Sequence, residues 1–324
     1  MCMIKMKDIA KIANVSEATV SRALNNKADI SPKTREKILK IIEEYDYIPN
    51  TVARSLYKHS SNIVGVVVPD LINPYFPEIV QAITTELAQK EFNIMLFNTQ
   101  NNPKIEETNI RTIASMHMAG LIIIAPNIHS LKYEHLNIPI VSIDGYISDR
   151  VPHITSNFYQ GAKLAVHILK KNHCKKVVHV SGPLIYQSSY ERYNGFIEQA
   201  KEESLEFDVI QTKLDGKDEI LIRDFFTKHT DIDGVFAAND SLAFLCIRVF
   251  SEIGVQVPKD IRIIGYDNNF LAKVVNPPLS TIAVPIVNLG KQAVTTLLKM
   301  TKREKHEPSY VFNVDYLKRK TTWD

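Results

Sequence analysis

The sequence is poor in cysteine, glycine and tryptophan, which number three, eleven and one in 324 residues. Cys2, Cys174 and Cys246 are scattered, odd in number and without metal-ligand spacing, so they exclude a disulfide framework and favour a reducing compartment. The few glycines form no GxGxxG, Walker or nucleophile-elbow motif, and neither HExxH nor CxxC occurs. We therefore expect no enzymatic activity, no metal site and no cofactor.

Long hydrophobic runs are also missing. No stretch reaches the roughly 18 apolar residues of a membrane span, and residues 1–10 hold no hydrophobic signal region, so we expect a cytoplasmic protein with no membrane partner. The formal net charge is only +3, but residues 1–62 carry eleven Lys and Arg against seven Asp and Glu. A local excess of positive charge is typical of a nucleic-acid-binding module attached to a nearly neutral domain.

Residues 7–25 have the pattern of a helix-turn-helix. Ile9, Ile12 and Ala13 recur at helical spacing and predict one apolar face of a first helix. Asn14 follows where a tight turn needs a left-handed backbone, which Asn tolerates best after Gly. The pattern predicts two short helices joined by a turn of few residues.

The second helix of this motif is predicted to start after Ser16, a good N-cap residue. Val20 and Leu24, four residues apart, would point back into the core. The remaining side chains would face outward, as a recognition helix in a DNA major groove requires. These outward-facing residues are Glu17, Ala18, Ser21, Arg22 and Asn25.

A third helix is predicted after Ser31, which precedes a proline as an N-cap residue often does. Ile38, Ile41, Ile42 and Tyr45 repeat at helical spacing and would form its apolar face.

A short segment follows the three helices. Asn50 would cap a segment that includes Leu56 and ends in the polar connector 58–61. About two turns of helix are unstable alone in water. We therefore expect this segment to fold only against another surface.

After residue 62, predicted strands and helices alternate. The run Ile63–Val68 is continuously apolar, as in a strand that is buried on both faces of a parallel sheet. Further strand and helix patterns alternate to about residue 300. This alternation predicts an α/β core of two doubly wound parallel-sheet subdomains.

Taken together, residues 1–60 resemble the DNA-binding headpiece and hinge of the LacI/GalR family of bacterial transcription regulators, and the rest resembles that family's periplasmic-binding-protein-like effector core. The resemblance implies three crossings between the subdomains, near Ser156, Pro285 and Tyr316. The expected parts are an all-α headpiece 1–48, a hinge helix and linker 49–61, and a core 62–324, in which 62–156 plus 286–316 form the N-subdomain and 157–285 plus 317–324 the C-subdomain.

The DNA contacts expected from the motif and the resemblance are of two kinds. Arg22 suits guanine, Ala18 a thymine methyl and Glu17 cytosine, whereas hydroxyl and amide side chains suit phosphates. The resemblance implies that Leu56 enters the minor groove of a near-palindromic operator, one from each chain of a dimer. The complete set is Ser16, Glu17, Ala18, Thr19, Ser21, Arg22, Asn25, Ser31, Thr34, Asn50, Ala53 and Leu56.

A ligand site is expected beyond the carboxyl ends of the parallel strands. The polar and aromatic residues at those positions include Asp70, Asn73, Phe76, Asp144, Asn239 and Asp267, and Arg192 lies one turn into the helix that opens at residues 188–189. Their planar groups can bracket the vicinal hydroxyls of a sugar, and an aromatic ring can pack on its apolar face. Residues 189–196, 238–240 and 265–268 match family motifs, which implies that this set binds a small effector.

The expected function is therefore a dimeric repressor of a carbohydrate-utilisation operon, released from double-stranded DNA by an allosteric sugar, with ribose first and a disaccharide second. No leucine heptads follow Tyr316, so we expect no coiled-coil tetramer. Two alternatives stay open. One is a family regulator controlled by a corepressor or partner protein. The other is a sugar-binding transport protein, which would have no use for residues 1–60.

Overall fold

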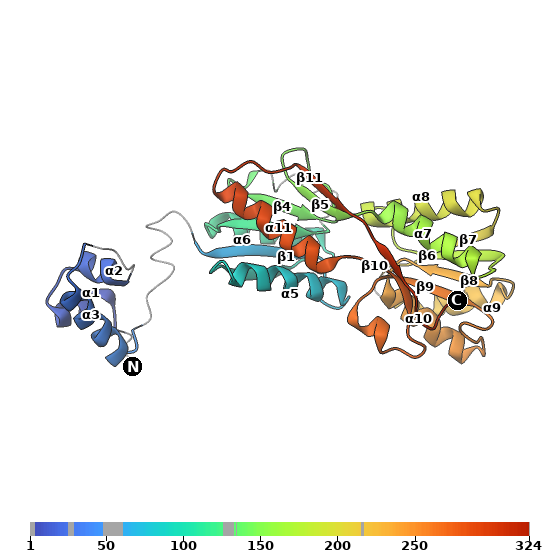
Figure 1. Ribbon diagram of the computed structural model, residues 1–324, viewed down its shortest axis with the longest axis horizontal. Helices are drawn as coiled ribbons and strands as arrows, with labels where there is room; N and C mark the ends of the chain where they lie inside the picture. The colour runs from blue at the N-terminus through green and yellow to red at the C-terminus, as the bar shows by residue number, and fades with distance from the viewer. Residues whose placement is uncertain are drawn as a thin grey trace. The chain divides into compact units, whose positions relative to one another are not determined.

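The computed structural model describes most of the chain, namely residues 4–24, 29–47, 61–125, 133, 135–214 and 217–323. The predicted DNA contacts of Asn25, Asn50, Ala53 and Leu56 lie outside these residues, as does the predicted hinge helix. The chain divides into two compact units, residues 1–61 and 62–324, and each is described by itself (Figure 1).

The first unit contains three helices around a small apolar core. Each helix contacts the other two, and Ile9, Val20 and Ile38 are fully buried between them. The helices are α1 (Met6–Ala13), α2 (Glu17–Leu24) and α3 (Pro32–Glu44).

The turn and both predicted caps of this unit are confirmed. Asn14 ends α1 in the left-handed conformation, with φ 54°. The Ser16 hydroxyl oxygen accepts the backbone N–H of Thr19 at 3.2 Å, and that of Ser31 accepts the N–H of Thr34 at 3.2 Å. Local hydrogen bonding thus sets where α2 and α3 begin.

Two apolar residues predicted to face this core are exposed instead. Ile12 is 43% exposed, because the buried face of the short α1 is formed by Ile9, Ala10 and Ala13. Tyr45 is 47% exposed because α3 ends at Glu44. The chain then turns, and Tyr47 returns to the core, where its N–H binds the carbonyl of Ile42.

The second unit begins with a six-stranded sheet in which every pair of neighbouring strands is parallel. Its order is β11 (Ser309–Phe312), β5 (His153–Ser156), β4 (Ile140–Ile143), β3 (Gly120–Ile124), β1 (Ile63–Val68) and β2 (Asn93–Asn98).

Alternate residues of β1 reach the two faces of this sheet. Val64 and Val66 share a core with α5 (Tyr75–Ala88) and α11 (Ile286–Thr301), which pack side by side (Figure 1). Val67 instead shares a core with Ile113 of α6 (Pro103–Ser115). Helices therefore cover both faces, as expected for a parallel sheet.

A second six-stranded sheet follows the same plan, and only its edge strand β12 runs antiparallel to its neighbour. The order is β12 (Asp315–Leu317), β10 (Ser280–Ala283), β9 (Arg262–Asp267), β8 (Gly234–Ala237), β6 (Lys176–Ser181) and β7 (Glu206–Gln211). Its helices are α7 (Phe158–Lys171), α8 (Gln187–Glu202), α9 (Glu219–Lys228) and α10 (Asp240–Glu252).

The chain passes between the two sheets three times. It leaves the first sheet after β5, returns between β10 and α11, and leaves again between β11 and β12. The last passage lies at residues 313–314, earlier than the expected position near Tyr316. Tyr316 already pairs with Ile282 in the second sheet.

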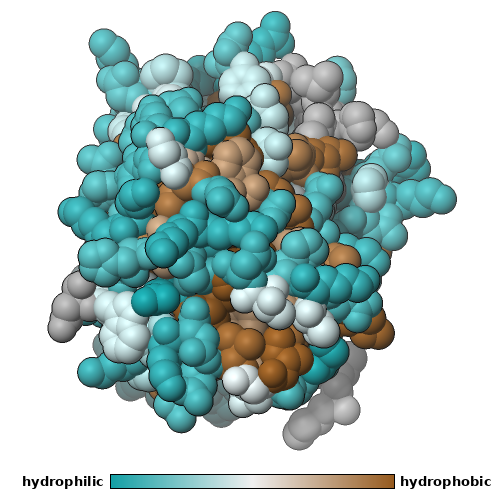
Figure 2. All heavy atoms as spheres, turned by 90° about the vertical axis from the view of Figure 1, so that its right-hand side faces the viewer, coloured by the Kyte–Doolittle hydropathy of each residue, from teal (hydrophilic) through white to brown (hydrophobic). Residues whose placement is uncertain are grey.

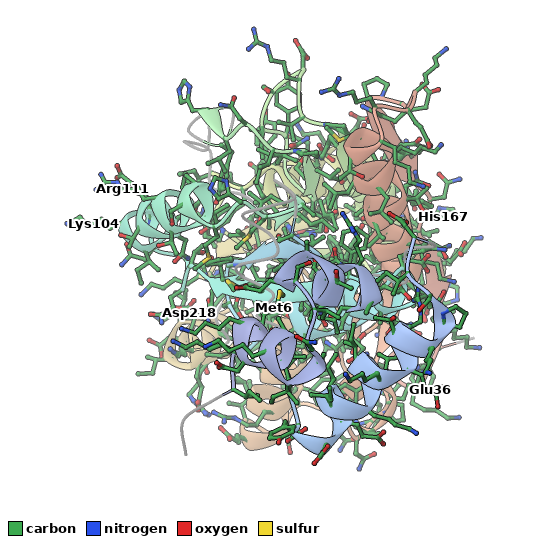
Figure 3. The ribbon with its side chains drawn as sticks, turned by 90° about the vertical axis from the view of Figure 1, so that its left-hand side faces the viewer. Met6, Glu36, Lys104, Arg111, His167 and Asp218 are labelled. Atoms are coloured by element: carbon green, nitrogen blue, oxygen red, sulfur yellow. The ribbon has the colours of Figure 1, made fainter. Side chains whose placement is uncertain are left out.

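The outer surfaces of the helices are largely charged. Hydrophilic side chains surround smaller hydrophobic areas at the end of the core that carries the second sheet (Figure 2). Between α9 and α10, Arg223 and Arg248 pair with Glu219 and Glu252. On α6, Arg111 projects outward (Figure 3) and pairs with a glutamate one turn earlier. Within the described ranges, no helix is long and apolar enough to cross a membrane.

Candidate ligand pocket and nucleic-acid interface

A cavity of about 1130 Å³ lies at the carboxyl ends of strands from both sheets of the core. Its first wall includes the loops after β1, β2, β3 and β4. Its second wall includes the loops after β6 and β7, the starts of α7, α8 and α10, and the end of β9. All seven residues predicted to bind an effector line it, namely Asp70, Asn73, Phe76, Asp144, Arg192, Asn239 and Asp267. The fold therefore gathers side chains that are far apart in sequence.

Arg192 of α8 is a buried cation of the second wall. Its guanidinium lies over the rings of Phe158 and Tyr266, 5.1 and 4.9 Å from their centroids, and the residue is only 6% exposed. Its Nε atom is buried and has no hydrogen-bond partner among the described residues. Stacking on two rings fixes the plane of the guanidinium, so its donors are pre-positioned for a ligand with several acceptors.

Asp267 and Asn239 complete the polar part of the second wall. Asp267 is 7% exposed, and no hydrogen bond between described residues uses its carboxylate oxygens. Burial and the nearby Asp240 raise the pKa of Asp267, and Arg192 opposes that rise. Asn239 uses its amide oxygen to accept the N–H of Leu242 at 2.8 Å, which caps α10 and leaves its amide nitrogen to donate.

The loop after β1, in the first wall, is held by its own side chains. One carboxylate oxygen of Asp70 accepts the N–H groups of Ile72 and Asn73, each at 2.8 Å. The amide oxygen of Asn73 in turn accepts the N–H of Tyr75 at 3.1 Å. The ring of Phe76 packs edge-on against Tyr75 at 5.4 Å. These side chains shape the loop, and part of their bonding capacity is already used.

Asp144, at the end of β4, is also engaged. The Tyr75 hydroxyl donates to one of its oxygens and the Thr155 hydroxyl to the other, the latter at 3.2 Å. Burial raises the pKa of Asp144 to about 6, although Tyr75, Thr155 and Arg192 each act to lower it. The carboxylate thus has accepting capacity left.

Two hydrogen bonds join the walls. The N–H of Tyr146 donates to Gln187 Oε1 at 3.1 Å, and the N–H of Phe270 donates to Glu78 Oε1 at 2.9 Å. Each bond links a residue associated with the first sheet to one associated with the second. The two subdomains are therefore in direct contact beside the cavity.

Sequence reasoning missed several pocket residues. Tyr75 lies in the predicted loop, but nothing in the sequence shows that its hydroxyl turns to Asp144. Phe158 follows β5, a strand that was not predicted, so its strand-end position was not visible. Tyr186 and Tyr190 flank the start of α8 and also line the cavity. An aromatic within a few residues of a strand end is the signal that could have found them.

The first unit presents an exposed helix surface. Glu17, Ala18 and Arg22 of α2 are exposed, as a base-reading face requires, whereas Thr19 and Ser21 are partly buried. The hydroxyls of Ser16 and Thr19 lie 2.9 Å apart, and those of Ser31 and Thr34 lie 2.8 Å apart. These four hydroxyls take part in the caps of α2 and α3. Of the four residues, Ser16 and Ser31 are exposed.

Comparison with known proteins gives two family matches. Residues 5–50 match the model of "Bacterial regulatory proteins, lacI family", and residues 166–322 match a "Periplasmic binding protein-like domain". The ribose operon repressor of Bacillus subtilis is 34% identical over 324 residues, which are 99% of each chain.

Two solved structures are similar to this chain. The lac repressor dimer bound to operator and the anti-inducer ONPF has a TM-score of 0.90 at 26% identity, covering 99% of this chain and all of the other. A LacI family regulator from Enterococcus faecalis with bound ribose has a TM-score of 0.74 at 27% identity, covering 80% of this chain and 98% of the other. By its sequence and its fold, this chain belongs to the lacI family of bacterial regulatory proteins.

Proposed function

We propose that this protein represses a carbohydrate-utilisation operon by binding a near-palindromic operator as a cytoplasmic homodimer, and that a small sugar, first D-ribose, releases it. The observation that carries the proposal is the cavity in which all seven predicted side chains meet, in a chain that also carries a lacI-type headpiece. The similarity to a ribose operon repressor and to a ribose-bound regulator supports ribose as the first candidate.

In this proposal α2 reads the operator. Arg22 would donate two hydrogen bonds to guanine and Ala18 would contact a thymine methyl. The exposed hydroxyls of Ser16 and Ser31 would contact phosphates and fix the register. The roles of Asn25, Asn50, Ala53 and Leu56 stay predictions, because these residues lie outside the described ranges.

The sugar would bind the second wall through Arg192, Asp267 and Asn239, whose donors and acceptors suit neighbouring hydroxyls. Asp144 and Phe76 would meet it from the first wall. The cavity, at about 1130 Å³, is larger than the roughly 300–1,000 Å³ of most ligand pockets. A pentose would thus leave part of the cavity empty. Ordered water would fill this space, or the two walls would move closer together.

Repression and release would be coupled through the positions of the two subdomains. A sugar that binds both walls favours one relative position, and a dimer can transmit that preference to the headpieces of both chains. A coupling free energy of about 1–3 kcal/mol would change operator affinity roughly 5–150-fold.

The test is a fluorescence-anisotropy titration of the full-length protein on an operator taken from upstream of its own gene, at fixed salt, with a panel of sugars. We expect ribose to weaken operator binding at least several-fold. Arg192→Ala should abolish this response and leave sugar-free operator affinity unchanged. Tight operator binding that no sugar shifts would contradict release by sugar and favour a corepressor or a partner protein. A sugar that tightens binding would also identify a corepressor.

A further inference from the structure

The turn that carries Asp267 has an unusual backbone. Asp267 has φ 109° and Asn268 has φ 61°, so two consecutive residues other than glycine adopt positive φ. Such conformations persist only where surrounding contacts hold them. Residues outside the cavity must therefore fix the direction in which the Asp267 carboxylate points.

Asp240 is one such residue. It is fully buried at the start of α10 and does not line the cavity. One of its carboxylate oxygens accepts the N–H of Asn269 at 2.8 Å, and the other accepts the Thr281 hydroxyl at 2.6 Å. A Cβ on Gly265 would lie 2.4 Å from Asp240 Oδ1, so only glycine lets β9 pass this close to the carboxylate. Asp240 thus ties the turn to α10 and β10.

Arg319, in the segment after β12, holds the same turn from the other side. Its guanidinium donates to the side-chain oxygen of Asn268 and, at 2.6 Å, to the carbonyl of Leu279. Its own N–H donates to Ser280 Oγ at 2.8 Å. Thr321, two residues later, also attaches this segment to β9, because its hydroxyl donates a hydrogen bond to the carbonyl of Ile263. The turn is therefore held between α10 and the C-terminal segment.

We propose that Asp240 and Arg319 are positioning residues that aim the Asp267 carboxylate into the cavity, so that the C-terminal segment sets the affinity for the effector. The inference rests on the proposed function of the cavity. Neither residue would touch the sugar.

The charges around Asp267 give the proposal a distinctive consequence. The groups that face it are Asp240 from α10, Arg192 from α8, Asp144 from the end of β4, Glu78 and Tyr75 from α5, and Tyr266 from β9. The Asp240 carboxylate raises the pKa of Asp267, while Arg319 attracts the Asp240 charge. Burial raises the pKa of Asp240 itself to about 7, so replacing it by the isosteric Asn keeps an acceptor for Asn269 and removes the negative charge that Asp240 carries near and above that pH. The pKa of Asp267 should then fall, and the charged form should persist to lower pH.

A simpler role for Asp240 is stabilisation of α10, since acidic residues favour the first turn of a helix. A role in stabilising α10 alone would lower thermal stability in Asp240→Asn without speeding amide exchange in the turn at residues 267–269. Exchange in the turn therefore separates the two roles.

The experiment compares the full-length wild type, Asp240→Asn and Arg319→Met, with Lys320→Met as the matched control. Lys320 is the next residue, is exposed, and contributes a backbone N–H to Pro278. D-ribose affinity is measured by calorimetry between pH 5.5 and 8. Amide hydrogen exchange of residues 263–272 is followed without sugar.

We expect Arg319→Met to weaken ribose binding about tenfold, as loss of an orienting partner does at metal sites, and to speed exchange in the turn. Lys320→Met should do neither. Asp240→Asn should shift the acid loss of affinity to lower pH. An unchanged pH profile in Asp240→Asn, or equal affinities in Arg319→Met and Lys320→Met, would overturn the inference.

The exchange measurement separates this inference from the proposed function. If the wild type binds no ribose, the proposed effector is wrong, and exchange alone decides the positioning role. Faster exchange confined to the turn in Arg319→Met supports that role. Equal exchange in Arg319→Met and Lys320→Met overturns it.

Discussion

The two walls of the cavity use similar side chains in different ways. In the first wall, the carboxylates of Asp70 and Asp144 already accept hydrogen bonds from their own subdomain. In the second wall, Arg192 Nε and the carboxylate of Asp267 have no partner among the described residues. Buried polar groups without partners are costly. In the proposed function, the second wall would therefore bind the ligand first, and the first wall would add shape and closure.

The largest expected effect is that of Arg192→Ala. Losing charge-assisted hydrogen bonds costs about 1.5–3 kcal/mol, so the dissociation constant for ribose should rise by up to about a hundredfold. Lys201→Ala removes an exposed positive charge from the same helix and serves as the control. Calorimetry with both variants checks this, and equal affinities would contradict the role given to the second wall.

The next prediction compares one carboxylate from each wall. Asp267→Asn should weaken ribose binding about 30-fold and Asp144→Asn about fivefold, because of the two only the Asp144 carboxylate already accepts hydrogen bonds from described residues. The same titration measures both variants. If Asp144→Asn costs more than Asp267→Asn, the order of the walls is reversed.

A smaller effect is expected from Asp70→Ala. The substitution frees the N–H groups of Ile72 and Asn73 and loosens the loop after β1. We expect ribose affinity to fall about threefold, since ordering the loop again on binding costs conformational entropy. The ribose dissociation rate in stopped flow should rise by a similar factor, and a slower rate would argue against the loop as a closing element.

The smallest effect concerns pH. Asp144, whose pKa is about 6, adds a second acid step to that of Asp267, because its protonation removes an acceptor, and ribose affinity should fall as pH drops from 7.5 to 5. The Tyr75 hydroxyl lowers this pKa, so Tyr75→Phe should move the fall in affinity to higher pH. Near pH 6 the variant should bind about two- to threefold more weakly, as one neutral hydrogen bond would give. A fall at lower pH than in the wild type would contradict the assignment.

Much of the fold could be predicted because local chemistry determines it. The caps at Ser16 and Ser31 and the left-handed turn at Asn14 depend on side chains within a few residues. The alternation of apolar strands with helices predicted two parallel sheets. The rule that ligands bind at strand ends, together with the resemblance to family motifs, then selected seven residues that line one cavity.

The strands that were not predicted are short, and each lies next to a point where the chain crosses from one sheet to the other. The sequences HITS, STIA, SYVF and DYL in β5, β10, β11 and β12 are three or four residues long and largely polar or mixed. Their place depends on pairing with strands far away in sequence, such as β11 with β5. Residues such as Phe158 and Tyr75 were missed for the same reason, since their partners are set by the tertiary fold.

The central claim is that sugar binding in the core and operator binding by the headpiece are coupled. The most direct measurement is the ribose dissociation constant of the full-length protein with and without saturating operator, at one salt concentration. Because coupling is reciprocal, ribose should bind the operator complex more weakly by the same factor by which it weakens operator binding. Equal ribose affinity in the two states would contradict the account.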